Sequence, residues 1–176
     1  MKQGYFVVGP ESSGTRLMTQ LLMGVGCFGD YTHDQRLDEP GLWPDEQRLV
    51  WRRSVPHRHN MPDVFLCIMR MRSNGYNTTV LVMSRDWHSM AISQEQIGHV
   101  KSTTEALSNI QLAYTYIFNS LLDATVAFEI VNYEALVARP QECAHYLFNR
   151  IGLGSSKQPK LPVVVYDGNA RYYERS

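Results

Sequence analysis

The segment "GPESSGTR" at residues 9–16 has the residue types and spacing of a loop that binds a phosphate group. Gly9 and Gly14 permit a tight turn, and the backbone N–H groups of residues 12–16 would point into a concavity at the start of a helix, where partial positive charge gathers. Further donors are the hydroxyl groups of Ser12, Ser13 and Thr15. The alternative is a glycine-rich helix start in which Ser and Thr serve only as caps.

The same loop lacks the lysine of a metal-dependent nucleoside triphosphatase. Its G-x-x-x-x-G spacing matches the phosphate-binding loop of such enzymes, but Thr15 stands at the lysine position and Arg16 follows it. Phosphoryl transfer on such a loop uses that lysine and a neighbouring hydroxyl that binds magnesium. A nucleotide or small-molecule kinase, with Asp86 as a metal ligand, therefore remains only as an alternative.

A second candidate for anion binding is "SRDWHSMAIS" at residues 84–93. Arg85 follows a predicted strand, and Ser93 lies eight residues later, about two turns along the next helix and on the same side of it. Both side chains could then grip one phosphate. The alternative is a surface arginine and a solvated serine.

Strands and helices alternate along the chain in a way that would place both motifs at one edge of a sheet. Apolar and β-branched runs predict strands at 5–9, 64–69, 78–84 and 126–131, and helical periodicity predicts helices at 14–23, 87–98, 103–122 and 140–153. Glycines and prolines predict that residues 26–62 are mostly loop, with at most a short helix at 45–53. This pattern predicts a three-layer α/β/α fold with a mainly parallel sheet, whose ligands bind beyond the carboxyl ends of the strands.

The composition limits the class of protein. The 176 residues, 44% of them hydrophobic, predict a single domain spanning residues 1–176. Lys plus Arg and Asp plus Glu both number 17, so no basic excess points to nucleic acid. The spacing of Cys27, Cys67 and Cys143 favours reduced thiols over disulfides or a zinc site. Without a signal-peptide pattern or a membrane-spanning run, we expect a soluble, cytoplasmic protein with no membrane partner.

Three ordered motifs resemble the sulfotransferases that use 3′-phosphoadenosine-5′-phosphosulfate (PAPS). Their phosphosulfate loop reads P-K-S-G-T-T-W or R-K-G-G-T-R, which is similar to Ser12-Ser13-Gly14-Thr15-Arg16, and "RDWHSMAIS" keeps the Arg, Asp and Ser of their 3′-phosphate motif but not its Pro. "VNYEALVARPQE…RIGL" resembles their third landmark, a strand that ends in Y-E-D-L before a helix begun by Pro. Together the matches run from residue 4 to about 153. The resemblance implies a P-loop NTPase-like topology and transfer of a sulfuryl group from PAPS to an acceptor hydroxyl or amine.

The resemblance also implies roles for individual residues, without a metal. The 5′-phosphosulfate would lie on the loop, and the 3′-phosphate would contact Arg85 and Ser93. The cofactor-binding set is Gly9, Glu11, Ser12, Ser13, Gly14, Thr15, Arg16, Arg85 and Ser93. Ser12 stands where the family has a lysine beside the transferring group, so Arg16 is the nearest cation that could substitute, and Glu11 would repel the donor unless it turns outward or pairs with an arginine.

The general base of the family is a histidine or a glutamate, and here the candidates are His33, then Asp34, then His57. The locally basic residues 48–59 could hold an anionic acceptor, although a solvated face is the default interpretation. The implied partner is a small-molecule or glycan acceptor, and because the chain is short for the family, its site is either open or completed by a second subunit of a homo-oligomer. A non-catalytic nucleotide- or phosphate-binding protein is a further alternative, since the loop lysine is missing.

Overall fold

The structure is a computed structural model that describes residues 1–32, 43–56, 60–154 and 167–173. Its strands are β1 (Lys2–Pro10), β2 (Arg48–Val55), β3 (Tyr76–Ser84) and β4 (Ala127–Asn132). Its helices are α1 (Thr15–Gly24), α2 (Val64–Ser73), α3 (Trp87–Gln96), α4 (Thr103–Ala124), α5 (Tyr133–Ala138), α6 (Pro140–Arg150) and α7 (Ala170–Tyr173).

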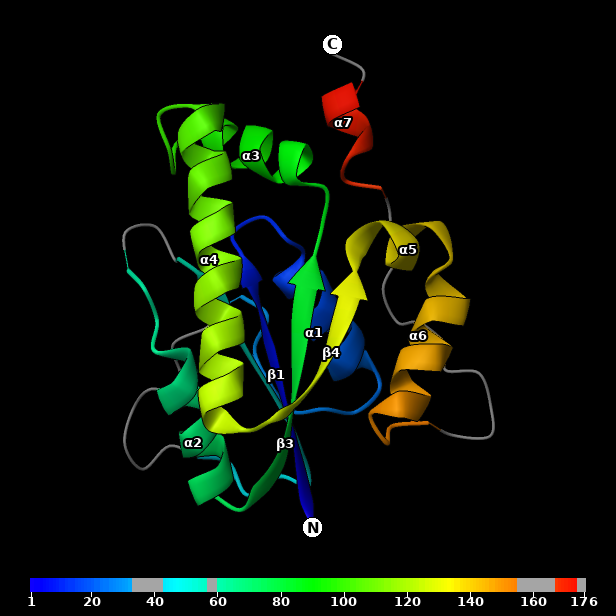
Figure 1. The fold of residues 1–176 in the computed structure, drawn as a ribbon. Helices are drawn as coiled ribbons and strands as arrows, with labels where there is room; N and C mark the ends of the chain where they lie inside the picture. The colour runs from blue at the N-terminus through cyan, green and yellow to red at the C-terminus, as the bar shows by residue number, and fades with distance from the viewer. Residues whose placement is uncertain (33–42, 57–59, 155–166, 174–176) are drawn as a thin grey trace.

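All four strands run parallel in the order β2-β1-β3-β4, so the described sheet is parallel as predicted. Strand β1 lies inside the sheet, where Val7 pairs with Arg52 of β2 and with Leu81 of β3. Because the strands are parallel, their carboxyl ends meet at one edge. In Figure 1 this edge faces upward, and α3, α5 and α7 lie around it.

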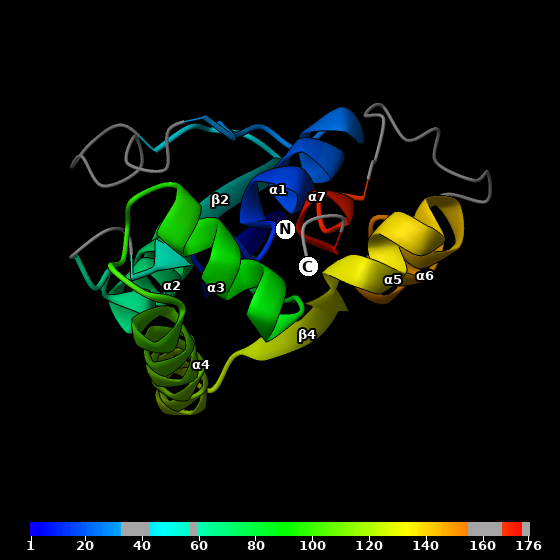
Figure 2. The same ribbon diagram turned by 90° about the horizontal axis from the view of Figure 1, so that it is seen from above.

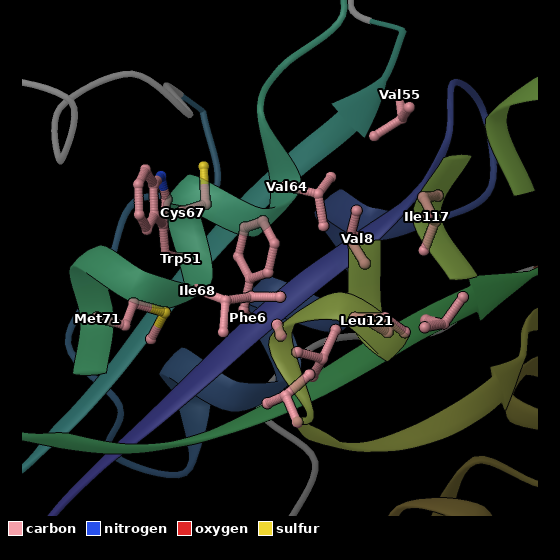
Figure 3. Close-up of a cluster of buried hydrophobic side chains, with 14 of the residues drawn as sticks. Phe6, Val8, Trp51, Val55, Val64, Cys67, Ile68, Met71, Ile117 and Leu121 are labelled. Atoms are coloured by element: carbon pink, nitrogen blue, oxygen red, sulfur yellow. The ribbon is translucent and has the colours of Figure 1, made fainter. Parts of the chain in front are cut away.

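Two apolar layers cover the two faces of the sheet, which confirms the predicted α/β/α layering. One face packs against α2 and α4 through Phe6, Val8, Ile68 and Ile117, among other side chains (Figure 3). The opposite face packs against α1 and α6 through a cluster that includes Tyr5, Val7, Met18, Leu21, Leu147 and Phe148. Figure 2 shows α4 and α6 on opposite sides of the sheet. The core is thus formed by alternate residues of the same strands.

Two predicted elements are wrong. Residues 64–69, predicted as a strand, begin the helix α2, because Asp63 caps its N-terminus by accepting a hydrogen bond from the Leu66 N–H and every third or fourth side chain is buried. The buried side chains of α2 are Val64, Cys67, Ile68 and Met71. Residues 45–53, given at most a short helix, contain most of the strand β2. The short helices α5 and α7 were not predicted.

The remaining elements match the predictions to within three residues at each end. Ser102 caps the N-terminus of the long helix α4, because its side chain accepts a hydrogen bond from the Glu105 N–H. The helix packs against α3 through Met90, Ala91, Ala106 and Ile110. Within the described ranges, no helix is both long enough and apolar enough to cross a lipid bilayer. The three cysteines are free thiols, and burial raises the pKa of Cys27 to about 11.

Candidate functional site

The loop between β1 and α1 has a backbone that its sequence makes possible. Ser12 and Gly14 have φ angles of 67° and 98°, in the left-handed region. A Cβ atom on Gly14 would lie 2.7 Å from Cδ2 of Tyr133, and one on Gly9 would collide with Ser13 Oγ. Glycine is therefore required at residue 14 for both backbone angle and space.

The N-terminus of α1 has no side-chain cap. Its N-cap residue is Gly14, which carries no side chain that could accept from the first turn. This excludes the interpretation in which Ser or Thr of the loop serves as the N-cap. The first N–H groups of a helix have no partner within the helix and carry partial positive charge, so this terminus is suited to an anion.

Two buried donor atoms near this loop have no hydrogen-bond partner in the described part of the chain: Ser13 Oγ and Arg85 Nη2. Ser13 is fully buried, and Arg85 is 8% exposed. An unsatisfied buried donor is costly, at ~1–3 kcal/mol and more for a charged group. Such donors are expected where a ligand supplies the missing acceptor.

Arg85, the residue after β3, joins the loop to the end of the neighbouring strand. Its Nη1 donates to the Ser12 carbonyl oxygen at 2.7 Å, and its Nε donates to Asn169 Oδ1 at 2.7 Å. Its guanidinium carbon lies 4.5 Å from the ring centre of Tyr133 and 5.8 Å from that of Tyr172. The structure thus brings together the two motifs that the sequence placed 73 residues apart, at the edge between β1 and β3.

A hydrogen-bond network that the sequence did not reveal holds Arg85 from the other side. Asn169 is 2% exposed and its Nδ2 donates to Glu134 Oε1 at 2.8 Å. The same Glu134 oxygen accepts from the Asp86 N–H at 2.9 Å. The Gly168 N–H donates to the Tyr133 hydroxyl at 2.9 Å. The segment 167–173 is therefore tied to the first residues of α5, and no motif in the sequence signals this contact.

Ser93 lies on α3, two turns from Arg85, and is 5% exposed. The described contacts include no hydrogen bond between the two side chains. Its neighbour Gln94 links α3 to the loop, since Gln94 Nε2 donates to the Glu11 carbonyl oxygen at 2.8 Å. Close by, burial raises the pKa of Tyr114 to about 12, and the Tyr114 hydroxyl donates to the Met83 carbonyl oxygen.

Glu11 is not turned outward. It is 6% exposed, and its Oε2 lies 2.6 Å from Nδ1 of His99, in the segment between α3 and α4. The pairing with a histidine was not predicted. A carboxylate held in this way points away from solvent and has a partner that can share its charge.

The other predicted site residues are exposed or lie outside the described residues. Arg16 is exposed on the first turn of α1 and makes no hydrogen bond or ion pair with the described part of the chain. His33, Asp34 and His57 fall in the segments 33–42 and 57–59, which the structure does not describe. Among described residues, no group of three or more His, Cys, Asp or Glu side chains is placed to hold a metal ion.

Comparisons with known proteins give matches among solved structures alone: no family model and no curated protein sequence matches the chain. A sulfotransferase from Alicyclobacillus acidocaldarius superposes with a TM-score of 0.57 and 12% identity, covering 98% of this chain and 90% of its own. The sulfotransferase domain of the Synechococcus PCC 7002 olefin synthase also gives 0.57, with 14% identity and coverage of 98% and 84%. The chain therefore has the fold of these sulfotransferases.

Proposed function

We propose that this protein is a sulfotransferase that moves a sulfuryl group from PAPS to a hydroxyl or amine of a small-molecule or glycan acceptor. The observation that carries the proposal is the buried Arg85, which contacts the loop after β1 yet keeps one guanidinium nitrogen without a partner in the described part of the chain. Buried charges of this kind are normally fully paired. In a sulfotransferase fold, an anionic ligand at the carboxyl edge of the sheet is the natural partner.

The donor's phosphosulfate would bind to the loop and to the start of α1. The backbone N–H groups of residues 12–16 and the Ser13 hydroxyl supply donors, and the uncapped helix terminus supplies partial positive charge. These groups are fixed before the ligand arrives, so they stabilise charge on the departing phosphate without reorganising. Thr15 and Gly9 belong to the same loop, and Gly9 packs closely against Ser13.

The donor's 3′-phosphate would accept hydrogen bonds from Arg85, whose Nη2 still has two N–H groups to offer. Ser93 would add a hydroxyl from α3. Hydrogen bonds between charged partners contribute ~1.5–3 kcal/mol each, enough to discriminate a 3′,5′-bisphosphate from a 5′-monophosphate by one to two orders of magnitude.

Catalysis would rely on positioning more than on a loop cation. Ser12 offers one neutral donor, and Arg16, exposed on the first turn of α1, is the cation that would approach the leaving group. His33, Asp34 and His57 stay predicted candidates for the base. The neutral loop also favours one other function, a nucleotide binder that does not transfer sulfate, because no lysine stands at residue 12 to stabilise the leaving oxygen.

The first test is ligand-induced stabilisation. We expect 3′-phosphoadenosine 5′-phosphate (PAP) to raise the melting temperature more than AMP or ATP with magnesium, and we expect Arg85→Ala to abolish the preference for PAP over AMP. Arg139→Ala is the matched control, since that side chain is 75% exposed and pairs with Glu142 rather than with the residues of the site. Stronger stabilisation by ATP with magnesium would contradict the proposal and favour a kinase.

The second test is transfer itself. A panel of phenols, alcohols, amines and sugars is incubated with PAPS carrying a labelled sulfuryl group, and labelled products are separated and counted. Transfer to any acceptor supports a sulfotransferase. PAP binding without transfer across the panel would support the nucleotide binder instead.

A further inference from the structure

The buried pair of Glu11 and His99 is not used by the donor-binding arrangement described above. Their contact joins residues 88 positions apart, Oε2 to Nδ1, at 2.6 Å. The side chain of Glu11 is 7% exposed and that of His99 is 25% exposed. The carboxylate is therefore the more buried member of the pair, and the imidazole is partly exposed.

With Glu11 ionised, the contact selects one tautomer of the imidazole. An ionised carboxylate can only accept hydrogen bonds, so Nδ1 of His99 must carry the proton that it donates to Glu11. Nε2 is then the atom with the free lone pair when the ring is neutral. No hydrogen-bond partner of Nε2 is found among the described residues. This is the arrangement in which a carboxylate orients a histidine that acts as a base.

The imidazole is also held firmly next to the loop. Glu11 directly precedes Ser12 in the chain, and its carbonyl oxygen accepts from Gln94 Nε2 at 2.8 Å. The His99 N–H donates to the Gln94 carbonyl oxygen at 3.0 Å. Gln94 thus connects the backbone of His99 and the backbone of Glu11, which places the ring beside the residues that would hold the phosphosulfate.

We propose that His99 is the general base of the transfer reaction and that Glu11 is its positioning residue. Nε2 of His99 takes the proton of the acceptor hydroxyl or amine as the acceptor atom bonds to sulfur. The bond between sulfur and the bridging oxygen breaks, and its electron pair stays on the phosphate of PAP. The resulting imidazolium is stabilised by the Glu11 carboxylate. This inference rests on the proposed function and adds a base that lies within the described residues.

The kinetic test compares His99→Ala, Glu11→Gln and His145→Ala with the wild-type protein. General bases contribute ~10²–10⁴ in rate, so kcat of His99→Ala should fall by that factor while its PAP affinity stays within about twofold of wild type. Added imidazole should restore part of that activity. Glu11→Gln should lower kcat about tenfold or more, again with little change in PAP affinity, because the oriented charge is lost. His145, on α6 with its side chain against Asn149, is the control and should be unaffected.

A second readout does not depend on turnover. Nitrogen-15 NMR of the free protein should show His99 as the Nδ1–H tautomer when neutral, and Glu11→Gln should shift this signal. An Nε2–H tautomer, full activity of His99→Ala, or no rescue by imidazole would overturn the assignment. If PAP does not bind to the wild type and PAPS gives no transfer, the proposed function fails as well. If the wild type transfers sulfate and His99→Ala is equally active, the assignment of the base alone fails.

Discussion

Asn169 gives the sharpest test of how the anion site is held together. Its side chain accepts from Arg85 Nε at 2.7 Å and donates to Glu134 Oε1 at 2.8 Å, and it is almost fully buried. Replacement by alanine removes both bonds and leaves two charged groups each short of a partner. Hydrogen bonds to charged groups contribute ~1.5–3 kcal/mol each, and relaxation with water entry recovers part of that.

We therefore expect Asn169→Ala to lower the free energy of unfolding by about 2–4 kcal/mol, which in a domain of this size corresponds to roughly 5–15 °C in melting temperature. Urea denaturation followed by circular dichroism measures the first quantity, and a thermal scan measures the second. The stabilisation by PAP should also shrink, because Arg85 loses the contact that orients its Nε edge.

The matched control is Asn149→Ala. That asparagine is exposed on α6 and its side chain contacts His145, so its loss should change the unfolding free energy by less than about 0.5 kcal/mol. An unfolding free energy of Asn169→Ala equal to that of wild type, or a loss matched by Asn149→Ala, would refute the proposed support of Arg85.

Three further outcomes are expected from stability measurements by urea denaturation. Gly14 and Gly26 have similar positive φ angles, of 98° and 95°, but only a methyl group at residue 14 would meet a neighbour, at 2.7 Å. Gly14→Ala should therefore lower the unfolding free energy more than Gly26→Ala, and equal decreases would show that the collision is relieved. Burial raises the pKa of Tyr5 from 10.0 to about 12, so the stability that the protonated Tyr5 contributes is complete below pH 10 and is lost as the pH rises to 12, by about 3 kcal/mol in all. Tyr5→Phe should flatten this decline, and an unchanged slope would contradict burial as its cause. Asp63→Ala removes the cap of α2 and should lower the unfolding free energy by ~1 kcal/mol, whereas no change would mean that water replaces the cap.

The sequence predicted the sheet well where a strand contains a continuous apolar run, as at residues 5–8 of β1 and 80–83 of β3. It failed at β2, where the glycines and prolines of residues 26–62 predicted a loop and where Arg52 and Arg53 are buried within the strand, at 6% and 4% exposure. Arg52 donates to the Tyr31 carbonyl oxygen, and Arg53 stacks over Trp51. Charged residues in a run normally indicate a solvated face, and these contacts depend on tertiary structure that the local pattern does not contain.

At α2, where a helix was predicted as a strand, the sequence contains a signal that could have corrected the prediction. A run of six apolar residues fits a buried strand or a buried helix equally well. Extending the window to Met71 reveals buried positions at helical spacing, with Phe65 and Met69 on the exposed face. The Asp63 cap is a second sign of a helix start.

The candidate site was predictable only in its local parts. The loop and Arg85 were identified because each follows a strand, and parallel strands end at one edge. The contacts of Asn169 with Arg85 and of His99 with Glu11 join distant segments with no spacing rule between them. Such pairs are determined by how helices and loops pack after the sheet has formed.

The sequence separations within the site have a consequence for folding. Arg85 bonds to Ser12 across 73 positions and to Asn169 across 84, while Glu11 and His99 are 88 apart. Contacts between distant segments form only after the entropy of closing long loops has been overcome. We expect hydrogen-exchange protection at these residues to appear late during refolding, after α4 and the centre of the sheet. A fragment that lacks residues 167–173 would accordingly keep secondary structure yet lose the order of its ligand site.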